Sequence, residues 1–124
     1  MRPAEAQGPP PSLSEVVHRA VEVTDPTGRY GAGDLPRYVE DSDEPVTAHA
    51  DIATDLAELK GRVDPQDEDP AVMMAIAAAT YLAFRRDEMD DNPGDILRLA
   101  ARAEYDGNPP DIVRAWLEEQ GVPL

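Results

Sequence analysis

The sequence predicts an all-α protein, a compact bundle of about five helices around a central apolar helix at residues 71–86. Three observations carry this prediction. Apolar residues recur at helical spacing in several segments, capping residues stand before most of these segments, and one segment is apolar on every side. The chain has 124 residues, a length that suits one domain, and we expect residues 12–124 to form it.

The first expected helix begins after Ser12, because Ser12 and Glu15 have the spacing of a capping box. It should end near Thr24, since residues 25–28 (Asp-Pro-Thr-Gly) resemble a type I turn. Before this helix, residues 1–11 are rich in Pro and Gly and predict a disordered tail. The apolar face of the helix comprises Leu13, Val16, Val17, Ala20, Val21 and Val23.

The middle of the chain predicts one short helix and one longer one. Residues 28–33 (Gly-Arg-Tyr-Gly-Ala-Gly) read as a flexible connector, followed by a short helix at 35–41 capped by Asp34. Thr47 is then the expected cap of an amphipathic helix. The apolar stripe of that helix is Ile52, Leu56, Leu59 and Val63, and its polar flank is Asp51, Asp55, Glu58 and Arg62.

Asp69 and Pro70 are a cap and a first-turn proline in their preferred order, and they open the central helix. Its apolar run, 71–84, is shorter than the ~20 residues of a bilayer span, so we expect no membrane insertion. Arg85 and Arg86 should lie in its last turns, where cations suit the helix dipole.

The last third predicts a helical hairpin at 93–120. An Asn cap and a first-turn proline, Asn92 and Pro93, open one expected helix, 93–105. The same pair of residue types, Asn108 and Pro109, opens a second expected helix, 109–120. An Asp-Gly pair at 106–107 joins the two helices, and a glycine at 121 should end the second.

The composition excludes several classes of function. The chain has 26 acidic and 11 basic residues, a formal charge of −15, which opposes direct nucleic-acid binding. It has no cysteine, and therefore neither disulfides nor thiolate metal sites nor a cysteine nucleophile. The N-terminal segment lacks the apolar run of a secretion signal, so we expect a cytoplasmic protein.

No residue pattern predicts a catalytic, cofactor or metal site. Glu15 and His18 have the spacing of one half of a di-iron motif, but the other histidine, His49, lacks the matching glutamate three residues before it. Because the motif is incomplete, an enzyme is not the leading interpretation. A small metal-dependent enzyme that uses these three residues is an alternative.

The charge distribution favours an interaction role. Residues 40–69 contain eleven acidic and two basic residues, a net charge of −9. We therefore predict a non-catalytic helical interaction or assembly module that meets a basic protein partner or a second copy of itself. An alternative is a nucleic-acid mimic that occupies a basic DNA-binding protein. The candidate contact residues are Asp51, Asp55 and Glu58, with a basic-aromatic cluster of Arg29, Tyr30, Arg37 and Tyr38.

Overall fold

The computed structural model describes residues 10–28, 31–41, 43–66 and 68–122. Within these ranges the chain is all-helical, apart from an isolated antiparallel bridge between Ser12 and Pro45, so the predicted fold class is confirmed. The α-helices are α2 (Leu13–Thr24), α3 (Ile52–Val63), α4 (Pro70–Phe84), α5 (Pro93–Tyr105) and α6 (Asp111–Glu119). Shorter 3₁₀ helices lie in the connections: η1 (Gly31–Tyr38), η2 (Val46–Ala48) and η3 (Arg86–Glu88).

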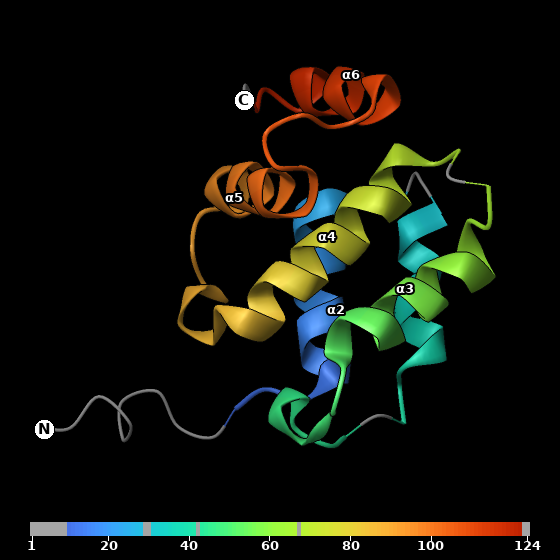
Figure 1. Ribbon diagram of the computed structural model, residues 1–124, viewed down its shortest axis with the longest axis vertical. Helices are drawn as coiled ribbons and strands as arrows, with labels where there is room; N and C mark the ends of the chain where they lie inside the picture. The colour runs from blue at the N-terminus through green and yellow to red at the C-terminus, as the bar shows by residue number, and fades with distance from the viewer. Residues whose placement is uncertain (1–9, 29–30, 42, 67, 123–124) are drawn as a thin grey trace, which may run out of the picture.

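The predicted central helix is α4. Figure 1 shows it crossing the middle of the molecule, with α2 behind it and α3 and α5 on either side. The side chains of residues 71–79 are all buried, and many of them are alanines, so neighbouring helices can approach closely. Burial does not extend to the end of the helix, because the Phe84 side chain is 66% exposed. α6 packs chiefly on α4.

The predicted caps of α2 and α4 are confirmed. The Ser12 hydroxyl accepts a hydrogen bond from the Glu15 amide at 3.1 Å, and the Glu15 carboxylate accepts one from the Ser12 amide at 3.2 Å. Asp69 caps α4 by accepting from the Ala71 amide at 3.0 Å. These bonds satisfy amides that have no partner inside a helix and thereby fix where each helix begins.

The connection between α2 and α3 differs from the prediction. The expected helix at 35–41 is instead the 3₁₀ helix η1, which starts at Gly31 and contains Asp34 rather than being capped by it. Two carboxylates hold its first amides: Asp69, 38 residues away, accepts from the Gly31 amide at 2.9 Å, and Asp25, eight residues away, accepts from the Gly33 amide at 3.2 Å. Residues 31–33 of the predicted connector therefore belong to η1.

Three predicted helix ends were wrong by a few residues. Asp51, not Thr47, caps α3, because its carboxylate accepts from both the amide and the hydroxyl of Thr54. α6 begins at Asp111 rather than residue 109, since a residue that precedes a proline disfavours helical backbone and Pro110 follows Pro109.

Asn108 consequently does not cap α6, and its side chain instead accepts from the Arg114 guanidinium at 3.3 Å. α4 ends at Phe84, ahead of the two arginines, and the Arg86 guanidinium donates back to the Ala83 carbonyl at 3.1 Å.

Two further predictions concern the chain ends and the membrane. The predicted tail lies outside the described residues except for positions 10 and 11. In the described ranges, no helix combines the length and apolar character that crossing a bilayer requires.

Candidate partner-binding surface

A small hollow of about 140 Å³ brings together three of the residues that the sequence proposes as contacts. It lies where the start of α2, the end of η1 and one flank of α3 meet. Tyr38, Asp55 and Glu58 all line it, although Tyr38 is well separated from the two acids in the sequence. The remaining lining residues are Leu13, Val39, Leu59 and Arg62.

The floor of the hollow is apolar and its wall is polar. Leu13, Val39 and Leu59 are buried members of the hydrophobic core, so the hollow ends on their side chains. Tyr38 is 48% exposed, and Asp55 and Glu58 are exposed at the surface. An apolar base with carboxylates and an aromatic ring around it suits a ligand that has an apolar stem and a cationic end.

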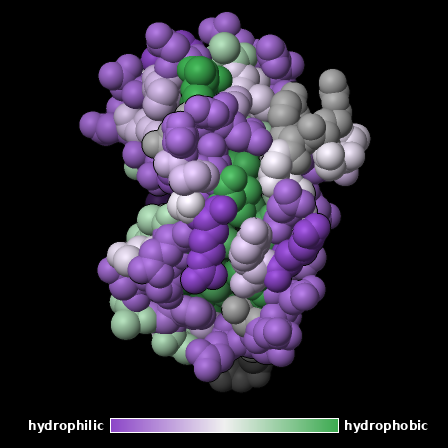
Figure 2. All heavy atoms as spheres, turned by 90° about the vertical axis from the view of Figure 1, so that its right-hand side faces the viewer, coloured by the Kyte–Doolittle hydropathy of each residue, from purple (hydrophilic) through white to green (hydrophobic). Residues whose placement is uncertain are grey.

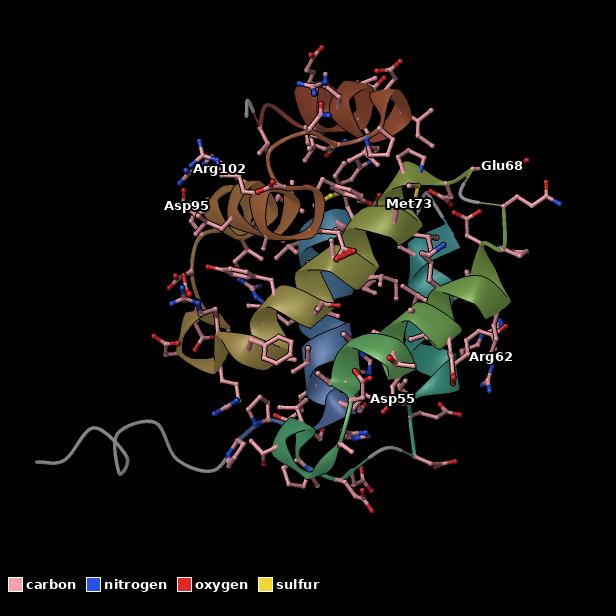
Figure 3. All side chains as sticks on the ribbon, viewed as in Figure 1. Asp55, Arg62, Glu68, Met73, Asp95 and Arg102 are labelled. Carbon is pink, nitrogen blue, oxygen red and sulfur yellow. The ribbon has the colours of Figure 1, made fainter. Side chains whose placement is uncertain are left out.

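The helical period of α3 explains why the acids face the hollow. Ile52, Leu56 and Leu59 are buried in the core, which places Asp55 and Glu58 on one flank of the helix. Figure 3 shows Asp55 and Arg62 on the side of α3 that is turned away from α4. The sequence predicted this polar flank, and the structure adds the surface that it faces.

Asp55 also contacts a histidine. One of its carboxylate oxygens lies 3.1 Å from Nδ1 of His49, whose side chain is 18% exposed. His49 precedes α3 and follows η2, so its ring is held against the same helix. This contact restrains the Asp55 carboxylate at the edge of the hollow.

The other predicted contact residues lie apart from the hollow. Asp51 caps α3, and its hydrogen bonds to the hydroxyl and amide of Thr54 lower the pKa of its carboxyl below the ordinary value of 3.8. The Arg37 guanidinium is 3.9 Å from the exposed carboxylate of Asp34, a pairing of little energetic weight. Arg29 and Tyr30 lie outside the described residues.

A second concavity runs along α4, and the sequence did not reveal it. Two adjoining hollows of about 300 Å³ and 320 Å³ share Thr80 and Glu104 in their linings. Ala53 and Ala57 line one side, and their four-residue spacing on α3 was the available signal. The charges that line it are mixed, with Lys60, Arg85 and Glu104, so electrostatics select no class of partner here.

The residues of the metal-enzyme alternative do not form a ligand set. Glu15 is engaged in the cap of α2, His18 is exposed on the same helix, and His49 contacts Asp55. Among the residues that the structure describes, no group of three or more His, Asp or Glu side chains could hold a metal ion. Every metal-dependent role would therefore need ligands other than these.

Hydrophilic residues cover most of the face of the molecule that Figure 2 shows. Figure 2 shows one face of the molecule, on which hydrophobic residues occupy a narrow central strip and a smaller patch near the top. Ile112 and Phe84 are, with Tyr38, the most exposed large hydrophobic side chains among the described residues.

Comparisons of the chain with protein-family models, with curated proteins and with solved structures gave no match.

Proposed function

We propose that this chain is a cytoplasmic, non-catalytic interaction module that binds a basic protein partner through the surface formed by η1 and α3. The observation that carries the proposal is the hollow in which Tyr38, Asp55 and Glu58 converge. Aromatic side chains beside desolvated apolar surface are typical of the residues that dominate protein interfaces.

The charge of the chain supports a basic partner over a second copy. At a formal charge of −15, two copies repel each other, whereas a positively charged protein is attracted over distances of about a Debye length. Carboxylates at the rim of an interface chiefly raise the association rate and the dependence on salt. We therefore expect binding that is fast and sensitive to ionic strength.

The nucleic-acid mimic receives less support from the local contacts. Within the acidic segment, Asp64 accepts hydrogen bonds from the Glu68 and Asp69 amides, and Asp69 and Asp51 cap helices. These carboxylates are oriented by the backbone of the chain itself. A surface that imitates a row of phosphates needs carboxylates that are directed outward toward the partner.

The test is affinity capture with the immobilised full chain and two matched variants. Asp55→Asn with Glu58→Gln removes two charges beside the hollow, and Glu118→Gln with Glu119→Gln removes two exposed charges on α6. We expect the wild type and the α6 variant to retain a basic protein that added salt releases. The α3 variant should retain much less of it.

Equal capture by all three proteins would contradict the proposal, because the interaction would then depend on charge without regard to place. Light scattering of the purified chain tests self-assembly, for which we expect a monomer. Displacement of the captured partner by duplex DNA would favour the nucleic-acid mimic instead.

A further inference from the structure

We infer that the hollow beside α3 receives the side chain of a single arginine from the partner. This inference rests on the proposed function and names the chemistry that the same surface recognises. Sites for drug-sized ligands have volumes of about 300–1,000 Å³, and this hollow, at about 140 Å³, is suited to one side chain.

The apolar floor of the hollow suits the methylene groups of an arginine side chain. Leu13, Val39 and Leu59 present buried carbon atoms at the base of the hollow. The methylene groups of an arginine that enters the hollow would leave water against this surface, while its charged end stays at the rim.

The rim accounts for the charged end. Asp55 and Glu58 are three residues apart on one helix, a spacing that places side chains next to each other. A guanidinium group presents several N–H donors in a plane and can bond two carboxylates at once, and it also stacks on aromatic rings such as Tyr38. An ammonium group offers only the point charge, so the combination favours arginine over lysine.

Arg62 should weaken the binding of a partner's arginine in the hollow. It lies one helical turn beyond Glu58 and lines the same hollow, so its positive charge is next to the position that the incoming guanidinium would take. The two cations repel each other, and they compete for the same carboxylates. Removal of the Arg62 charge should therefore strengthen the binding of a partner's arginine.

The experiment is an NMR titration of the isotope-labelled full chain with capped three-residue peptides. The peptides carry arginine, lysine or citrulline between two glycines, and citrulline keeps the shape of arginine without its charge. We expect the arginine peptide to shift the resonances of Tyr38 and Leu59 and to bind more tightly than the other two. Arg62→Gln should tighten its binding about two- to fivefold, as removal of one exposed charge interaction implies.

The Asp55→Asn, Glu58→Gln variant should lose this binding, and the Glu118→Gln, Glu119→Gln variant should keep it. Circular dichroism checks that all variants are folded. Equal binding of the lysine or citrulline peptide, or weaker binding by Arg62→Gln, would overturn the inference. If capture of a partner depends on Asp55 and Glu58 but the arginine peptide causes no shift at Tyr38, the inference fails while the proposed function stands.

Discussion

The phenol of Tyr81 lies half-buried on α4 and donates a hydrogen bond to the Glu88 carboxylate at 2.8 Å. Burial, together with this bond and the negative charge of Glu88, raises the pKa of Tyr81 to about 12 from its ordinary value of 10. Each of these causes favours the protonated phenol, because a phenolate here would be poorly hydrated and would face a second anion.

This raised pKa predicts a loss of stability at high pH. Between pH 10 and 12 the folded chain retains a proton that the unfolded chain releases, so the free energy of unfolding falls as the pH rises through this window. Below pH 10 the contribution is complete. We expect Tyr81→Phe to remove this part of the pH dependence, measured by urea unfolding at several pH values. An identical pH profile for the wild type and Tyr81→Phe would contradict the assignment, and Tyr38→Phe, at an exposed position, is the matched control.

At the scale of the elements, prediction from sequence succeeded where neighbouring residues decide the structure. The capping box at Ser12 and Glu15 and the Asp-Pro start of α4 were both identified, since each depends on contacts within one turn. The start of η1 could not be identified in this way. Its Gly31 amide is held by Asp69, which is 38 residues away in the chain.

In the candidate site too, features set by neighbouring residues were predictable, and features set by packing between elements were not. The acidic flank of α3 was predictable from the helical period, whereas its meeting with Tyr38 and Leu13 depends on how α2, η1 and α3 pack. The misplaced cap at Thr47 has a local cause, because Thr47 lies inside η2 and Asp51 and Thr54 form the cap four residues later. From the sequence, Asp51 was assigned to the polar flank of the helix and Thr54 was not considered.

Substitutions of two glycines test how much the contact between η1 and the cap of α4 contributes to stability. A Cβ added to Gly31 would lie 2.9 Å from the Asp69 carboxylate, whereas one added to Gly61, inside α3, would meet nothing within 4 Å. We expect Gly31→Ala to lower the free energy of unfolding by about 1–2 kcal/mol, because it displaces a carboxylate that also caps α4.

Gly61→Ala should raise the free energy of unfolding by about 0.5–1 kcal/mol, since alanine loses less backbone entropy in a helix. Urea unfolding of the wild type and of each variant would measure both changes. Equal effects of the two substitutions would show that the contact between Gly31 and Asp69 contributes little.

The whole molecule has an excess of acidic residues that must weaken its compact state through mutual repulsion. Three ion pairs, Arg37–Asp34, Arg98–Asp95 and Arg85–Glu88, do little to offset it, because their contacts of 3.5–4.0 Å each involve at least one exposed group. Stability therefore depends on the apolar core around α4, and the surface charge acts against it.

We accordingly expect sodium chloride to stabilise the protein. Screening of the repulsion should raise the midpoint of thermal unfolding at neutral pH, by roughly 4 °C for each kcal/mol gained. A variant with Glu40→Gln, Asp43→Asn and Glu44→Gln, all at exposed positions, should begin with a higher midpoint and respond less to salt. A midpoint that falls as salt is added would instead mean that attractive charge pairs dominate.

Asp69 has one further effect, on the order in which parts of the chain can come apart. Its carboxylate serves the first turn of α4 and the amide of Gly31 at once. One of its oxygens accepts from the Gly31 amide and the other from the Ala71 amide, so a motion that carries this carboxylate away with the η1 segment also removes the cap of the central helix. A single side chain thus couples opening of the η1 segment to loosening of the first turn of the innermost helix.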